Sequence, residues 1–161
     1  MPADREEERV IPPIGAPVPD FALPDQWGRT VRLTDFRGIR PIVLVFVPFA
    51  FSRTCTGELG ELRDNLEHFE RADAALLVSS VDSKYALRAW AEAESYGFPL
   101  LSDFWPHGAV AAAYGAFSPE SGFANRSTFV IDRQGVIRSH FATGPGEPRP
   151  LSLYRAALDA L

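Results

Sequence analysis

The only cysteine of the sequence, Cys55, is the residue best suited to nucleophilic or redox chemistry. It follows a run of β-branched and aromatic residues at 42–47 and precedes a segment with helical spacing. A cysteine at the start of a helix meets free backbone N–H groups and the positive end of the helix dipole, and both favour its thiolate. The end of a buried strand is also where an α/β sheet opens into a ligand crevice. Cys55 is therefore predicted to be a reactive thiol.

Other interpretations of Cys55 stay open on these grounds alone. A buried structural cysteine is common in protein cores. A dithiol oxidoreductase is disfavoured because there is no second cysteine. A Cys–His hydrolase would also place its nucleophile at a helix start, but no local signature marks a partner histidine. A redox sensor, a thiol-dependent chaperone and a binding module with a decayed site complete the alternatives.

The residues around Cys55 form a recognisable pattern. The spacing Pro48-x-x-x-Ser52-x-x-Cys55, followed downstream by Arg126 in the segment 124–132, resembles the active-site motif of the peroxiredoxin family. Segments 99–103 and 55–59 add to the resemblance, which extends over residues 15–161. Within the family, the chain is most similar to the AhpE type of one-cysteine peroxiredoxin, known from bacteria that use mycothiol.

The resemblance implies a thioredoxin-like fold and a peroxidase that reduces hydrogen peroxide, organic hydroperoxides or peroxynitrite. Cys55 would attack the peroxide and become a sulfenic acid. Ser52 would exchange hydrogen bonds with the thiolate and the peroxide. Pro48 would shield the pocket from water, and Arg126 would hold the thiolate and stabilise charge on the peroxide oxygens. Serine at position 52 replaces the commoner threonine, which keeps the hydroxyl but removes a methyl that restricts its rotation.

The resemblance also implies the partners. Without a second cysteine, an external thiol must resolve the sulfenic acid, and mycothiol with a mycoredoxin or a thioredoxin-like protein is expected in that role. A homodimer is expected as well. The mechanism requires no cofactor and no metal, and the sequence shows no cluster of metal-ligating residues.

Composition narrows the class of protein. The chain has 161 residues and a net charge of −5, and its arginines form no basic run, so nucleic-acid binding is disfavoured. The longest apolar stretch, 42–51, is too short to span a membrane. The N-terminus is charged and lacks the apolar core of a signal peptide, so a cytoplasmic location is expected. Residues 1–14 are expected to form a flexible tail, and residues 15–161 a single domain.

Hydrophobic periodicity predicts alternating strands and helices. Strands are expected at 21–23, 30–33, 42–47, 74–81, 98–101, 128–131 and 136–141, and helices at 56–71, 83–95, 109–114 and 151–161. Ser83 is a candidate N-cap, and residues 132–135 form a hairpin turn. The strand–helix–strand unit at 42–81 predicts a parallel pair. The fold class is therefore α/β, with a central mixed sheet flanked by helices on both faces.

Five polar residues keep two interpretations or receive no role. Arg53 adds positive potential near the thiol or is an exposed loop residue. Glu58 stabilises the first turn of its helix or contacts Arg126 or Arg53. His107 belongs to an aromatic loop, 104–108, that is expected to serve packing or a dimer contact rather than chemistry. His68 is expected to face solvent, and no partner is suggested for His140, which lies in a strand.

Overall fold

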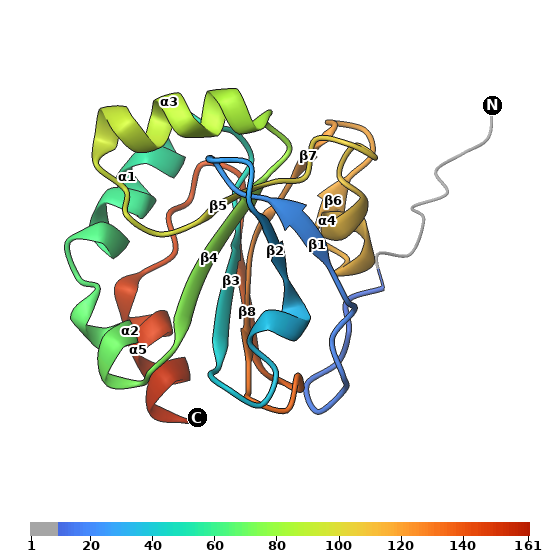
Figure 1. The fold of residues 1–161 in the computed structure, drawn as a ribbon, viewed down its shortest axis with the longest axis vertical. Helices are drawn as coiled ribbons and strands as arrows, with labels where there is room; N and C mark the ends of the chain where they lie inside the picture. The colour runs from blue at the N-terminus through green and yellow to red at the C-terminus, as the bar shows by residue number, and fades with distance from the viewer. Residues whose placement is uncertain (1–9) are drawn as a thin grey trace.

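The computed structural model describes residues 10–161 and is built around one five-stranded sheet (Figure 1). The strands follow the order β5-β4-β3-β8-β9. Their bounds are β3 Ile42–Phe46, β4 Ala75–Ser80, β5 Leu100–Ser102, β8 Arg126–Ile131 and β9 Ile137–Thr143. β3 and β5 run parallel to β4, whereas β8 runs antiparallel to both β3 and β9. The predicted α/β class with a mixed sheet is confirmed.

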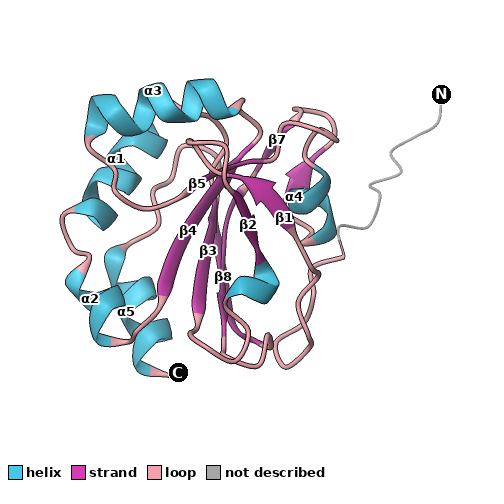
Figure 2. Cartoon of the chain, viewed as in Figure 1, coloured by secondary structure: helices cyan, strands magenta, loops and turns pink. Residues whose placement is uncertain are grey.

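Helices cover both faces of the sheet (Figure 2). One face is covered by α1 Arg53–Arg63, α2 Glu67–Arg71, α3 Lys84–Glu94 and α5 Leu151–Asp159. The other face is covered by the short helix α4 Ala109–Ala113, the 3-10 turn η1 Leu33–Asp35 and the hairpin of β1 Ala22–Pro24 and β2 Thr30–Arg32. A small pair, β6 Phe117–Ser118 and β7 Phe123–Ala124, lies beside α4.

The central strand β3 is buried along its whole length, which explains its uninterrupted run of apolar residues. Val43 and Val45 point into the core beneath α1 and α3, while Leu44 and Phe46 point into the core on the opposite face. A strand that is apolar on both faces has a stable place only in the middle of a sheet. At the carboxyl end of β3 the chain leaves the sheet and forms the loop that leads to Cys55 in α1.

The helix predicted at 56–71 is wrong in its bounds, because the structure has two helices there. α1 begins at Arg53 and ends at Arg63, and α2 begins only at Glu67. The side chain of Asn65 donates to the carbonyl of Glu61 at 2.8 Å and thus replaces a backbone hydrogen bond where the helix breaks. The earlier start places Cys55 inside the first turn of α1 rather than before it.

Several local predictions are confirmed. Ser83 is the N-cap of α3 and accepts the N–H of Ala86 at 3.2 Å. The turn at 132–135 joins β8 to β9, with Gly135 at a φ of +79°. The flexible tail predicted at 1–14 lies mostly outside the described residues and stays a prediction, as does the domain boundary. No helix within residues 10–161 is both long and apolar enough to cross a membrane.

Replacing the N-cap of α3 tests this local account of its stability. Ser83→Ala is expected to lower the free energy of unfolding by about 1 kcal/mol, because the N–H of Ala86 loses its acceptor. Urea denaturation followed by circular dichroism measures the change. Ser83→Asp, which restores an acceptor, is expected to recover the lost stability. An unchanged midpoint in Ser83→Ala would contradict the cap.

Candidate active site

Cys55 is the third residue of α1 and is fully buried, with 0 % of its surface exposed. The sequence brings it there because α1 turns one apolar face, which includes Leu59 and Leu62, toward the sheet. Cys55 lies at the start of this face, directly after the loop that leaves β3. It is a free thiol in the structure.

Pro48 and Ser52 lie in the short connection between β3 and α1, as the motif predicts, and both are half-buried. Ser52 occupies the N-cap position of α1, but its hydroxyl does not cap the helix. It donates instead to the carbonyl of Phe49 at 2.9 Å. The N–H groups of the first turn around Cys55 therefore receive no side-chain acceptor from Ser52.

The residue after Cys55 fastens the first turn of α1 to the neighbouring helix. The indole Nε1 of Trp90 donates to the hydroxyl of Thr56 at 3.2 Å. The hydroxyl of Tyr96, just beyond α3, donates to the carbonyl of Thr56 at 3.1 Å. Burial raises the pKa of Tyr96, so its phenol remains a neutral donor. Two side chains thus fix the backbone immediately next to the cysteine.

Glu58 lies one helical turn after Cys55 on the same buried face of α1, and it gathers two arginines. Arg126, the first residue of β8, donates through Nη1 to Glu58 Oε1. Arg149 forms a two-pronged contact, from Nε to Oε2 at 2.9 Å and from Nη2 to Oε1 at 3.0 Å. The backbone N–H of Arg149 adds a bond to Oε2 at 2.7 Å. Glu58 therefore contacts Arg126, one of the two interpretations left open.

Arg149 is a member of the buried cluster that the sequence analysis missed. Its guanidinium is buried and its Nη1 donates to the carbonyls of Phe46 and Ser127, both at 2.9 Å. It therefore ties α1 to the ends of β3 and β8. Its sequence context, between Pro148 and Pro150 in a Gly- and Pro-rich loop, is typical of exposed segments, so no signal marked it.

The charges of this cluster support one another. Burial alone would raise the pKa of Glu58, but the hydrogen bonds and charge of Arg149, with the charge of Arg126, outweigh it and lower the pKa. Burial alone would lower the pKa of Arg149, but neighbouring charges and the bonds to Glu58 raise it. Arg149 thus binds a carboxylate that lies one helical turn from Cys55 on α1.

One donor of the cluster remains unused. The Nε of Arg126 is buried and has no hydrogen-bond partner within residues 10–161. Buried N–H groups are rarely left without an acceptor, so such a group marks a place where a ligand atom can be received. This donor belongs to the guanidinium that Glu58 holds beside the helix face of Cys55.

The remaining polar residues named from the sequence lie apart from this cluster. Arg53 is exposed and forms no ion pair with any described residue. His107 bonds through Nε2 to the carbonyl of Gly122 at 2.7 Å, which is a packing role. His68, predicted to face solvent, does so only in part: its side chain is 22 % exposed, and its Nε2 accepts from Arg155 of α5.

His140 lies on β9, and burial lowers its pKa. Its ring stacks on Phe129 with centroids 4.5 Å apart, and its Nε2 has no partner among the described residues. No acid lies in contact with it in this part of the chain. The structure therefore assigns His140 no chemistry, in line with its omission from the predicted site.

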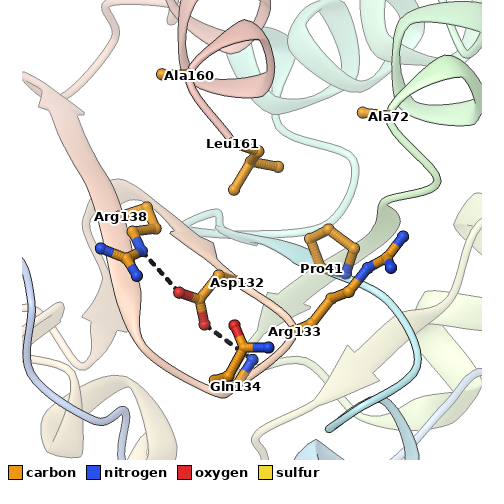
Figure 3. Close-up of a pocket in the computed structure, with 8 residues that line it drawn as sticks. All are labelled: Pro41, Ala72, Asp132, Arg133, Gln134, Arg138, Ala160 and Leu161. Atoms are coloured by element: carbon orange, nitrogen blue, oxygen red, sulfur yellow. Dashed lines mark hydrogen bonds and ion pairs between the residues drawn. The ribbon is translucent and has the colours of Figure 1, made fainter.

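A cavity of about 460 Å³ lies near the start of β3, whereas Cys55 follows the end of that strand. Figure 3 shows the residues that border it. The cavity is bordered by Pro41, which precedes β3, by the turn after β8 and by the C-terminal Leu161. Its one acid, Asp132, is bound by Arg138 at 2.6 Å and by N–H groups of its own turn. These bonds outweigh burial and lower its pKa. The described residues also contain no group of side chains that could hold a metal ion.

The buried cluster predicts how stability depends on pH. The folded-state pKa of Glu58 is below its ordinary value of 4.5, so its contribution is complete above that value and is lost as the pH falls toward the folded pKa. Glu58→Gln is expected to cost about 3 kcal/mol at neutral pH, because it leaves two arginines without a buried counter-charge. Glu58→Gln is also expected to remove the loss of stability that protonation of Glu58 causes at acid pH.

Urea denaturation at pH 7 and at a series of acid pH values measures both effects. Glu61→Gln, on the exposed side of the same helix, is the matched control and is expected to change neither quantity. If Glu58→Gln lost the same stability at every pH, ionisation of Glu58 would not be the source of the effect.

The chain is similar in sequence to known peroxide-reducing proteins. Over 148 residues the chain is 49% identical to the alkyl hydroperoxide reductase E of Mycobacterium tuberculosis, covering 92% of this chain and 97% of the relative. It is 31% identical to the chloroplastic 2-Cys peroxiredoxin BAS1 of Hordeum vulgare, covering 94% and 76% of the two chains. The predicted resemblance to the AhpE type is thereby confirmed.

Solved structures confirm the fold. The crystal structure of peroxidoxin BcpB from Mycobacterium tuberculosis superposes with a TM-score of 0.83 at 31% identity, covering 93% of this chain and 98% of that one. The AhpC of Enterococcus faecalis gives a TM-score of 0.84 at 27% identity, with coverage of 93% and 92%. The model of the AhpC/TSA family matches residues 14–140. The chain therefore belongs to the AhpC/TSA family.

Proposed function

We propose that the protein is a thiol-dependent peroxidase that works through Cys55. The observation that carries this function is the charge balance beneath the cysteine. Two arginines, Arg126 and Arg149, share one carboxylate, Glu58, so the buried cluster keeps one uncompensated positive charge. A thiolate at Cys55 supplies the missing negative charge from the chain itself, so no ion from solvent is needed to balance the cluster.

The reaction follows from the chemistry of a thiolate and a peroxide. The sulfur of Cys55 attacks one peroxide oxygen, an S–O bond forms and the O–O bond breaks. The sulfur is oxidised by two electrons to the sulfenic acid, and the departing oxygen takes a proton and leaves as an alcohol or water. Arg126 Nε offers its free N–H to the oxygens as charge develops on them.

Ser52 and Pro48 have supporting roles in this proposal. The hydroxyl of Ser52 already donates to a backbone carbonyl, so its lone pairs are free to accept the peroxide O–H. Pro48 lacks a backbone N–H, so it offers water no donor at the loop next to the cysteine. Together with the N–H groups of the first turn of α1, these residues surround the position that the peroxide must occupy.

Magnitudes show why oriented donors are needed. An ordinary cysteine, with a pKa of about 8.5, is roughly 5–10% ionised near neutral pH, so complete ionisation gains only about tenfold. Each donor aimed at developing charge is worth about 10²–10³ in rate. A fast peroxidase therefore depends more on Arg126, Ser52 and the helix N–H groups than on thiolate formation alone.

The second half of the cycle requires a partner. The chain has one cysteine, so an external thiol must attack the sulfenic acid, form an S–S bond and release water. A second thiol then returns Cys55 to its reduced form. Mycothiol with a mycoredoxin, or a thioredoxin-like protein, is the proposed source. This rests on the similarity to the mycobacterial relative.

Three further points complete the proposal. The name of that relative, alkyl hydroperoxide reductase E, supports organic hydroperoxides as substrates beside hydrogen peroxide. Exposed aromatic residues, such as Phe49 in the loop before Cys55 and Trp105, support a homodimer, because aromatic side chains are enriched in interfaces. A free thiol is stable in a reducing compartment, which supports a cytoplasmic location.

Direct oxidation of the protein tests the assignment of Cys55. Mixing reduced protein with one equivalent of peroxide is expected to consume the thiol orders of magnitude faster than a free cysteine, and excess peroxide is expected to add two oxygens as a sulfinic acid. Quenched-flow thiol counting and mass spectrometry measure the two events. Cys55→Ser is expected to fold and to consume no peroxide. Turnover retained in this variant would sink the assignment, and a rate like that of a free thiol would favour a structural cysteine.

Removing the unused donor tests the role of Arg126. Arg126→Ala is expected to slow peroxide oxidation of Cys55 by about 10²–10³, the usual effect of losing an oriented donor. The matched control is Arg133→Ala, an exposed arginine at the opposite end of the sheet, for which no change is expected. Rates measured across pH separate the two roles. If the defect disappears where the thiol is fully ionised, Arg126 acts only by favouring the thiolate.

A further inference from the structure

The loop of residues 48–52, which joins β3 to Cys55, has a backbone that needs support. Phe51 has a φ of +63°, in the left-handed region that residues with a side chain seldom adopt. Its ring is 57 % exposed, so burial of this side chain provides little to stabilise the conformation. Strained residues of this kind persist only where surrounding contacts hold them.

One hydrogen bond supplies that support. Within residues 10–161, the only bond from loop 48–52 to a distant part of the chain runs from the N–H of Ala50 to Oδ2 of Asp82, at 2.7 Å. Asp82 comes just after β4, 32 positions along the chain. The other contacts are apolar, between Phe49 and Phe123 and between Phe51 and Trp90.

Asp82 is itself held in place from two strands. The hydroxyl of Ser80, the last residue of β4, donates to the same Oδ2 at 2.6 Å. The hydroxyl of Ser102, the last residue of β5, donates to the carbonyl of Asp82 at 2.6 Å. No described residue forms an ion pair with Asp82. Its carboxylate is thus a fixed acceptor directed at the loop.

Oxidation of Cys55 by a peroxide and its reduction by a thiol require different positions of this loop. Cys55 exposes none of its surface, so a thiol reductant, which is bulkier than a peroxide, reaches the sulfur only when the loop moves away. A peroxide is close to water in size and needs only a small displacement to reach the sulfur, and it needs the loop otherwise in place because the loop carries Ser52. A firmly held loop therefore favours the reaction of Cys55 with small oxidants, and a loosely held loop favours its reaction with bulky thiol reagents.

We propose that Asp82 is the positioning residue that holds the loop of residues 48–52 closed over Cys55, through its bond to the N–H of Ala50. The proposal rests on the proposed peroxidase function for its effect on rate. Its effect on access to Cys55 is independent of that function. Losing the bond opens the loop, which weakens the alignment of Ser52 and exposes the sulfur.

The experiment compares two rates in the full-length protein and three variants. The first is oxidation of Cys55 by hydrogen peroxide, and the second is alkylation of reduced Cys55 by N-ethylmaleimide, a neutral and bulkier reagent. Asp82→Ala removes the acceptor. Asp82→Asn keeps a carbonyl oxygen with two lone pairs, enough for both Ala50 and Ser80. Ser83→Ala, the matched control, weakens the neighbouring helix cap without touching the loop.

Asp82→Ala is expected to slow peroxide oxidation about tenfold and to speed alkylation about tenfold, the effect of losing one bond to a charged acceptor. Asp82→Asn is expected to stay within about threefold of the unmodified protein in both rates, because its bond is neutral but present. Ser83→Ala is expected to change neither rate. Because Ser83→Ala also lowers stability, its unchanged rates distinguish loss of the loop's bond from general destabilisation.

Three outcomes overturn the proposal. Asp82→Ala could leave alkylation unchanged, or Asp82→Asn could behave like Asp82→Ala, or Ser83→Ala could speed alkylation as much as Asp82→Ala does. If Asp82→Ala does not fold, hydrogen exchange in the unmodified protein replaces it, and an Ala50 amide that exchanges as fast as an open loop overturns the proposal. Slow peroxide oxidation of the unmodified protein contradicts the proposed function instead, and the alkylation rates still decide the role of Asp82.

Discussion

The buried ionic cluster of Glu58 with its two arginines is the interaction on which the site depends. Transferring three charges into a protein interior is costly unless each finds partners. Here the carboxylate accepts four hydrogen bonds, and Arg149 also binds two carbonyls at the ends of β3 and β8. These bonds join α1, two strands and the loop before α5, so the cluster fixes the relative positions of these elements around Cys55.

The cluster also explains why the site lies where it does. β3 is apolar on both faces and must occupy the middle of the sheet, so its carboxyl end is enclosed by β4 and β8. Cys55, one short loop beyond that end, is buried because it lies on the face of α1 that packs against the sheet. A buried thiol would remain neutral in a purely apolar setting, since burial disfavours the charged form. The arginines supply the polar environment that the surrounding core lacks.

Local features of the site were predictable from the sequence, and long-range ones were not. Cys55 and Ser52 could be predicted because consecutive residues define a strand–loop–helix junction. Arg126 could be predicted because it belongs to a recognisable motif. Arg149 was not predicted because Glu58 and Phe46, two of its partners, lie 91 and 103 positions away. Its own segment is rich in glycine and proline, which indicates a surface loop. Only the folded chain brings such residues together.

The same limit applies to the fold. The periodicities of strands and helices predicted the central mixed sheet, and local sequence predicted the N-cap Ser83, because these features depend on neighbours in the sequence. The break between α1 and α2 depends on a single side-chain bond from Asn65, which competes with the helix in a segment whose apolar stripe continues unbroken. The orientation of His68 depends on Arg155, 87 positions later. Periodicity carries no information about either contact.

The bond from Trp90 to Thr56 has an optical consequence. The indole is fully buried, and its N–H is held by the residue next to the cysteine. Any movement that unwinds the first turn of α1 must break that bond and change the polarity around the ring. Indole emission responds to both changes, so the protein carries a native chromophore whose spectrum follows the opening and closing of the site.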